Sequence, residues 1–199
     1  MPHLSLRLEV NFVKADFLKS KHSQGLGFDA YVATDPNRAA NWHAKHKAIS
    51  LDHSQREYLG GLIRRMPVIC LSGIWCGDCA TQCPMIAAIA DASPMIDLVF
   101  LDRDEHADLS NEVRIAGGNR VPTVIWLSEE FEFVHLFGDR TLSRYRRMAA
   151  TQIGPSCPLP SFTPPADENA AILAEWLAEF ERVQLILQLS PRLRQLHGD

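Results

Sequence analysis

Two short apolar runs constrain the fold of this chain more than any other feature. Residues 68–74 and 96–101 are rich in β-branched residues and do not alternate with polar ones, a pattern typical of strands buried on both faces of a sheet. Each run is followed by a segment of helical composition, at 78–92 and 104–115. Strands that alternate with helices in this way predict an α/β fold.

The next two apolar runs add an antiparallel part to this sheet. Residues 123–127 and 131–137 are separated by three polar residues, a connection short enough for a hairpin. Residues 141–150 are expected to form the helix that follows. The sequence therefore predicts a central mixed sheet flanked by helices on both faces.

The N-terminal segment is predicted to be largely helical. Apolar and polar residues alternate from 4 to 12, which indicates one half-buried strand. Asp35-Pro36 is typical of a helix start, and a second helix is expected over 54–65, with Pro67 ending it.

The C-terminal segment is predicted to form a linker and one long helix. Five prolines within 154–165 predict an irregular linker, because proline fixes φ and lacks a backbone donor. From a capping Asp167 to the residue before Pro191, apolar residues recur at helical spacing: Ile172, Leu173, Trp176, Leu177, Phe180, Val183 and Leu187. We expect this stripe to dock on its own domain, and the alternative is the interface of a homodimer or another partner.

The length of 199 residues fits one domain with additions. We predict an N-terminal extension packed on the domain at 1–65 and a core at 66–150. A proline-rich linker is expected at 151–166 and a C-terminal helix at 167–199.

Composition excludes several classes of partner. The formal net charge of −4 offers no general attraction to nucleic acid or to an anionic membrane surface. The N-terminus lacks the apolar stretch of a signal peptide, and no segment is apolar for long enough to span a bilayer. We therefore expect a cytoplasmic protein, in which a Cys-x-x-Cys pair is more often catalytic or metal-binding than structural.

The residues with the clearest chemistry are Cys76-Gly77-Asp78-Cys79, where an apolar strand ends and a helix begins. A helix N-terminus stabilises a thiolate, which lowers the pKa of such a cysteine from about 8.5 to roughly 3.5–7.5. Two intervening residues also allow the thiols to form a disulfide. Cys76 is thus predicted to attack a substrate disulfide, and Cys79 to release the mixed disulfide.

These residues resemble the thioredoxin family, and further positions match it. Trp75 resembles the family's pocket tryptophan, Pro84 its kinking proline, Val121-Pro122-Thr123 its cis-proline segment, and Gly138 the glycine after its last strand. Arg103-Asp104-Glu105 and Gly117-Gly118-Asn119-Arg120 are similar to a bacterial thioredoxin-like branch with Trp-Cys-Gly-Asp-Cys sites. The resemblance covers about residues 66–147.

The resemblance implies a thioredoxin-like fold and a thiol-disulfide oxidoreductase whose only redox group is the Cys76–Cys79 disulfide. Trp75, Gly77, Val121 and Pro122 would then contact the substrate, with the Val121 backbone pairing to an extended segment. The expected partners are protein disulfides as substrates, and a thioredoxin-reductase-type flavoprotein or a low-molecular-weight thiol that regenerates the dithiol.

Two departures from the family bear on the mechanism. Cys70 stands where thioredoxins commonly have a buried acid that assists proton transfer to the resolving cysteine. Asp78 stands where they have proline, and brings a carboxylate near both thiols. We hypothesise that Asp78 replaces the missing acid as a proton shuttle and raises the pKa of Cys76, since a like charge disfavours a thiolate.

Other interpretations of these cysteines and histidines remain open at this point. Cys76, Cys79 and Cys83, with a histidine, have the residue types of a zinc site, and a redox-inactive binding module is the third alternative. We expect Cys83 to be a packing residue or a secondary oxidation site, Cys70 a core residue, and Cys157 a thiol without a role. His43 and His46 are expected to lie on a solvated basic helix face.

Overall fold

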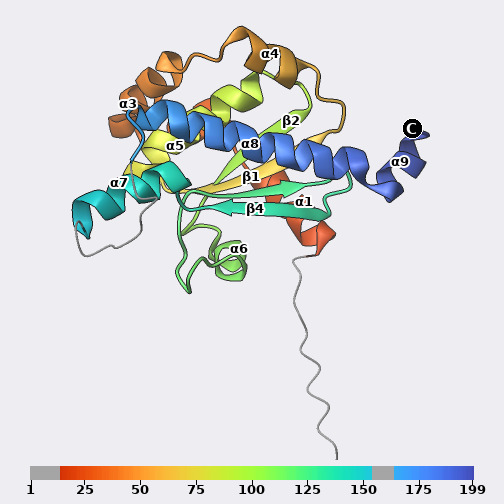
Figure 1. The fold of residues 1–199 in the computed structure, drawn as a ribbon. Helices are drawn as coiled ribbons and strands as arrows, with labels where there is room; N and C mark the ends of the chain where they lie inside the picture. The colour runs from red at the N-terminus through yellow and green to blue at the C-terminus, as the bar shows by residue number, and fades with distance from the viewer. Residues whose placement is uncertain (1–13, 154–163) are drawn as a thin grey trace, which may run out of the picture.

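The computed structural model describes residues 14–153 and 164–199, and its centre is a four-stranded sheet (Figure 1). Its strand order is β2-β1-β3-β4, with bounds β1 (Met66–Ser72), β2 (Ile96–Asp102), β3 (Thr123–Leu127) and β4 (Phe133–Gly138). β1 and β2 are parallel, whereas β3 pairs antiparallel with both β1 and β4. The predicted mixed sheet and its hairpin are therefore confirmed.

Helices cover both faces of the sheet. One face carries α5 (Gly77–Asp91) and α8 (Glu168–Leu189), with α3 (Pro36–Ala48) and α4 (His53–Gly60) beside them, and the other carries α1 (Ala15–Gln24) and α6 (Ala107–Glu112) (Figure 1). The remaining helices are α2 (Phe28–Val32), α7 (Leu142–Gln152) and α9 (Pro191–His197). None of the helices in the described ranges is long and apolar enough to cross a membrane.

The central strand β1 places the candidate site. All seven of its residues are buried, because helices cover both of its faces and strands flank both of its edges. In the register of the sheet, Cys70 lies between Phe100 and Val124. The chain leaves β1 and enters α5 within a few residues, so the first residues of α5 lie at the carboxyl end of the central strand.

Two predicted helices are shorter than expected, and local hydrogen bonds explain both differences. The helix expected over 54–65 ends at Gly60, and the backbone N–H groups of Ile63 and Arg64 donate to the Gln184 side chain instead of to helix carbonyls. The helix expected over 104–115 is confined to α6. The first residues of the expected helix, Asp104 and Glu105, form a turn instead, and their backbone N–H groups donate to the carboxylate of Asp102.

The C-terminal helix packs on its own domain, as expected. Asp167 caps α8 by accepting a hydrogen bond from the N–H of Ala170 at 3.0 Å. The buried stripe of α8 joins the main core through Ile172, Trp176, Phe180, Val183 and Leu187. The Trp176 indole N–H donates to the amide oxygen of Gln82 in α5, which ties α8 to the helix that carries the candidate site.

The predicted start of α3 is also confirmed, since Asp35 accepts a hydrogen bond from the N–H of Asn37 at 3.0 Å. The sequence did not predict α1, α2 or α9 individually. The strand expected over 4–12, most of the proline-rich linker and Cys157 lie outside the described residues.

Candidate active site

Cys76 occupies the N-cap of α5. Its Sγ accepts a hydrogen bond from the backbone N–H of Cys79 at 3.5 Å, the usual contact of a capping side chain with the first turn. The side chain of Cys76 is half-buried, whereas Cys79 is fully buried. A substrate arriving from solvent therefore reaches the sulfur of Cys76 first.

The segment before β3 closes the site on the other side. The thiol of Cys76 donates to the carbonyl of Val121 at 3.8 Å, and the Val121–Pro122 peptide bond is cis, as the resemblance implies. Gly138 in β4 makes this arrangement sterically allowed. A Cβ at that position would lie 2.4 Å from the carbonyl oxygen of Pro122, closer than any side chain can approach.

The thiols of Cys76 and Cys79 interact directly. Their hydrogen bond and the burial of Cys76 raise the pKa of that thiol above its ordinary value, while the N–H groups of Cys79 and Asp78 lower it. The expectation of a lowered pKa was wrong for this dithiol, because a neighbouring thiol and partial burial outweigh the helix N-terminus. The pKa of the Cys79 thiol is raised as well, so the two cysteines differ in the exposure of their side chains rather than in the direction of their pKa shifts.

The buried thiols predict a pH dependence of stability. Burial raises the pKa of both Cys79 and Cys83 above that of a thiol in the unfolded chain. The folded state therefore holds these protons more tightly, and this contribution is fully present below about pH 8.5 and is lost as the pH rises. We expect the free energy of unfolding of the reduced protein to fall by about 1 kcal/mol per pH unit for each thiol between pH 8.5 and 9.5.

Urea unfolding under reducing conditions at several pH values measures this fall. The pKa of Cys76 is raised as well, so three thiols contribute to this slope. The Cys83→Ala variant provides the control, because it should remove about a third of the slope. A stability that is flat across the same range would contradict buried, neutral thiols.

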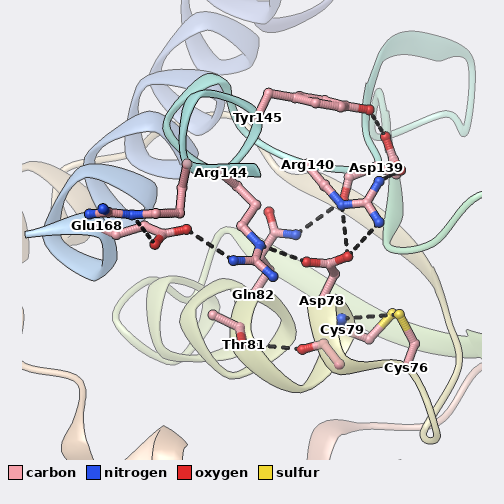
Figure 2. Close-up of polar contacts among 12 residues, drawn as sticks. Cys76, Asp78, Cys79, Thr81, Gln82, Asp139, Arg140, Arg144, Tyr145 and Glu168 are labelled. Carbon is pink, nitrogen blue, oxygen red and sulfur yellow. Dashed lines mark hydrogen bonds and ion pairs between the residues drawn. The ribbon is translucent and has the colours of Figure 1, made fainter. Parts of the chain in front are cut away.

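The carboxylate of Asp78 binds two arginines of the α7 region (Figure 2). Arg140 reaches one oxygen at 2.6 Å, and Arg144 donates to the other at 2.9 Å. The Asp78 side chain is only 11% exposed, so this ion-pair cluster is largely shielded from water. Because cations engage both oxygens, the geometry gives the proton-shuttle hypothesis no support and makes Asp78 an anchor for the first turn of α5.

A second buried carboxylate extends this cluster. Asp139 follows Gly138 and accepts hydrogen bonds from Arg120, Arg140 and the hydroxyl of Tyr145. Arg144 also contacts Glu168 at the start of α8, so Figure 2 shows a continuous chain of polar contacts from α5 to α8. The start of α5 is thereby connected to α7 and, through Arg144, to the start of α8.

Trp75 lies directly before Cys76 and is 46% exposed, which is unusual for so large an apolar side chain. The guanidinium of Arg103 stacks 4.7 Å from the centre of its ring. Arg103 also donates to the carbonyl of Asn119 at 3.1 Å. The two sequence motifs that resemble the bacterial branch thus meet at Arg103, whose guanidinium lies over the Trp75 ring.

Cys83 turns away from the solvent side of the site. Its sulfur lies 3.8 Å from the sulfur of Cys70 and 3.5 Å from the Ser72 hydroxyl, beneath α5. Within residues 14–153 and 164–199, no group of three histidine, cysteine or acidic side chains is arranged to hold a metal ion. The zinc alternative therefore gains no support from the geometry.

Sequence reasoning missed one part of the site, a cavity of about 320 Å³ beside Cys76. The turn around Cys76 lines one side of it, and α3 lines the other with Asn37, Arg38, Asn41, Trp42 and Lys45. The sequence interpretation placed His43 and His46 of this helix on a solvated basic face, and no spacing in the chain indicates that another face of the helix lies beside the cysteines. Among its lining residues, Arg38 and Lys45 carry positive charge and none carries negative charge.

The fold of this chain is shared with solved structures. A protein of unknown function from Pseudomonas aeruginosa matches with a TM-score of 0.60 and 19% identity, covering 84% of this chain and 94% of the other. An HIV epitope scaffold matches with a TM-score of 0.60 and 17% identity, covering 86% and 98% of the two chains. No curated protein matches the sequence.

A thioredoxin family model matches residues 25–150, which is more than half of the chain. The match includes α2, α3 and α4, so helices that the sequence interpretation placed in an N-terminal extension lie within the matched region. The mixed sheet, the covering helices and this match agree, and the chain belongs to the thioredoxin family.

Proposed function

We propose that this protein is a thiol-disulfide oxidoreductase that reduces protein disulfides in the cytoplasm with its Cys76/Cys79 dithiol. The observation that carries the proposal is the pairing of a half-exposed sulfur at a helix N-terminus with a buried thiol three residues later. The cis-proline segment against the same sulfur and the exposed Trp75 beside it supply a surface for substrate.

The reaction has two exchange steps. Cys76 loses its proton and attacks one sulfur of the substrate disulfide, and the second substrate sulfur leaves as a thiolate that takes up a proton. Cys79 then loses its proton and attacks the sulfur of Cys76 in the mixed disulfide, which releases the other substrate thiol. The dithiol is oxidised to the Cys76–Cys79 disulfide, and the substrate gains two electrons and two protons.

The substrate is bound by the groups that surround Cys76. Trp75 and Gly77 are the exposed residues on either side of Cys76 in the chain, and the carbonyl of Val121, next to the cis-proline Pro122, contacts its thiol. In the proposed complex, the Val121 backbone pairs with an extended substrate segment, as an added strand pairs with a sheet edge.

The electrostatics of the site favour the reducing direction. Strongly oxidising dithiols owe their potential to a stabilised thiolate in the reduced form. Here the pKa of Cys76 is raised, so the reduced form gains no such stabilisation. We therefore expect a reduction potential nearer to about −270 mV than to about −120 mV.

A turnover assay tests the proposed function. The protein is mixed with a substrate that contains an accessible interchain disulfide, and either a reductase-type flavoprotein with NADPH or glutathione serves as the electron donor. We expect catalytic cleavage of the substrate disulfide with one of these donors. If neither donor reduces the Cys76–Cys79 disulfide, the donor assignment fails, and if the reduced protein leaves the substrate intact, the function fails.

We propose that Asp78 positions the active-site turn through its two arginines. The Asp78→Asn substitution removes the charge that compensates Arg140 and Arg144 in a largely buried cluster. We expect it to lower the free energy of unfolding by about 1–3 kcal/mol, between the values for exposed and buried pairs. The pH profile of Cys76 alkylation should stay unchanged, since the carboxylate acts on arginines rather than on sulfur.

Urea unfolding and iodoacetamide kinetics measure these two effects. Glu130→Gln is the matched control, because Glu130 pairs with Arg192 in an exposed position and its loss should cost little. An alkylation profile displaced in Asp78→Asn would restore the proton-shuttle hypothesis.

We also propose that the cavity beside α3 favours negatively charged substrates. Lys45 lines this cavity, so Lys45→Glu reverses a charge close to Cys76. We expect the variant to react about 5-fold more slowly at low salt with a dianionic aromatic disulfide, an effect of about 1 kcal/mol. Its rate with a neutral disulfide should be unchanged.

Stopped-flow absorbance at low and high salt measures both rates. Lys47→Glu, on the same helix but outside the cavity lining, is the matched control and should leave both rates unchanged. Equal effects of the two substitutions would contradict a specific role for the cavity.

A further inference from the structure

Four cysteines form a line of sulfurs from the surface of this protein into its core. Cys76 begins the line at the N-cap of α5, and its sulfur accepts the backbone N–H of Cys79 in the first turn. Cys83 follows Cys79 one helical turn further along α5, and both side chains are buried. The sulfur of Cys83 lies 3.8 Å from that of Cys70 in β1, and all four residues are free thiols.

The inner half of this line is sealed from solvent. Cys70, Cys79 and Cys83 have no exposed surface, so Cys76 is the one of these four cysteines that a dissolved oxidant reaches directly. The Ser72 hydroxyl contacts the Cys83 sulfur at 3.5 Å. This hydroxyl supplies a short-range polar contact at a place where packing alone requires only apolar atoms.

We propose that Cys70 and Cys83 form a second redox pair, which receives oxidising equivalents from the Cys76–Cys79 disulfide. The inference rests on the proposed function, because that function generates the disulfide. It adds a second disulfide inside the domain, at the position where a buried cysteine replaces the family's usual acid.

The transfer needs two internal exchange steps. The thiol of Cys83 loses its proton and attacks the sulfur of Cys79 in the Cys76–Cys79 disulfide, and Cys76 leaves and takes up a proton. Cys70 then loses its proton and attacks Cys83 in the Cys79–Cys83 disulfide, and Cys79 leaves and takes up a proton. The Cys70/Cys83 dithiol is oxidised to a disulfide, and the Cys76/Cys79 dithiol is restored.

The one-turn spacing of Cys79 and Cys83 and the contact between Cys83 and Cys70 make each step an exchange between neighbouring cysteines. A disulfide bond is about 2.05 Å long, so the sulfurs of Cys70 and Cys83 must approach further from 3.8 Å. In the proposal, rotation of their side chains supplies this approach. The restored Cys76/Cys79 dithiol can then reduce another disulfide, so one fully reduced chain delivers four electrons to two substrate disulfides.

Mass spectrometry of thiol oxidation tests the second pair. The Cys157→Ser protein is fully reduced, freed of reductant and mixed with excess glutathione disulfide. Samples are quenched with acid, and their remaining thiols are alkylated under denaturing conditions. We expect two thiols to disappear first and two more afterwards without a glutathione adduct, and peptides linked through Cys70 and Cys83 should appear with the second step.

Two variants in the same background separate the relay from other routes. Cys83→Ala should lose the second disulfide and keep the first. Cys76→Ser/Cys79→Ser should oxidise Cys70 and Cys83 at least tenfold more slowly, because the entry point of the relay is gone.

The outcomes distinguish this inference from the proposed function. If Cys76 and Cys79 form their disulfide while Cys70 and Cys83 stay reduced, the second pair is overturned and the proposed function stands. If the Cys70–Cys83 disulfide forms equally fast in the double-serine variant, the relay is overturned. If Cys76 and Cys79 form no disulfide, both proposals fail.

Discussion

Replacing Cys76 with serine is expected to abolish disulfide reduction, with a loss of rate of at least about a thousandfold. A serine hydroxyl is a far weaker nucleophile than a thiolate, and the fully buried Cys79 has no access to a substrate disulfide in its place. The turnover assay measures this loss, and circular dichroism and urea unfolding check that the fold is retained.

The matched substitution at the second cysteine should give a different result. Cys79→Ser retains the attacking sulfur but lacks the thiol that resolves the mixed disulfide. We therefore expect it to accumulate a covalent complex with substrate that a reducing agent dissolves. If Cys79→Ser turned over normally, or if Cys76→Ser trapped the substrate, the assignment of attacking and resolving thiols would be reversed or wrong.

The second large effect is expected at the C-terminal helix. Trp176 is fully buried, packs edge to face on Phe137 at 5.2 Å between ring centres, and donates to Gln82. Truncating it to alanine leaves a large cavity and an unpaired amide oxygen beneath α5. We expect Trp176→Ala to lower the free energy of unfolding by about 3–5 kcal/mol.

Urea unfolding followed by circular dichroism measures this cost. Leu185→Ala, on the same helix but 47% exposed, is the control and should change the stability by less than about 1 kcal/mol. A small effect of Trp176→Ala would contradict the description of α8 as an integral part of the core.

The sequence predicted the elements whose signals are local. β3 has the predicted bounds, and Asp35 and Asp167 cap the helices that they were expected to begin. These predictions are confirmed because their signals are local: a strand buried on both faces needs continuous apolar residues, and a helix start needs a side-chain acceptor. By contrast, α1 buries the polar side chains of Lys21 and His22 along with Leu18, so its sequence lacks a clear apolar stripe.

The parts of the site that depend on tertiary contacts could not be predicted. Nothing in the sequence near Asp78 indicates that its carboxylate binds Arg140, just before α7, and Arg144, within α7. The position of the Lys45 side chain beside the Cys76 cavity likewise depends on how α3 packs on α5. The direction of the pKa shift at Cys76 also follows from its contact with the Cys79 thiol, which spacing alone does not determine.

Equilibration of the purified protein with glutathione redox buffers tests the central claim most directly. The fraction of chains with a Cys76–Cys79 disulfide is measured by mass after acid quenching, and zinc content is measured on the same sample. The account predicts a reversible two-electron transition on the reducing side of the glutathione scale, without stoichiometric metal. Two cysteines that stay unbridged across all buffers, or that retain one zinc ion per chain, would contradict it.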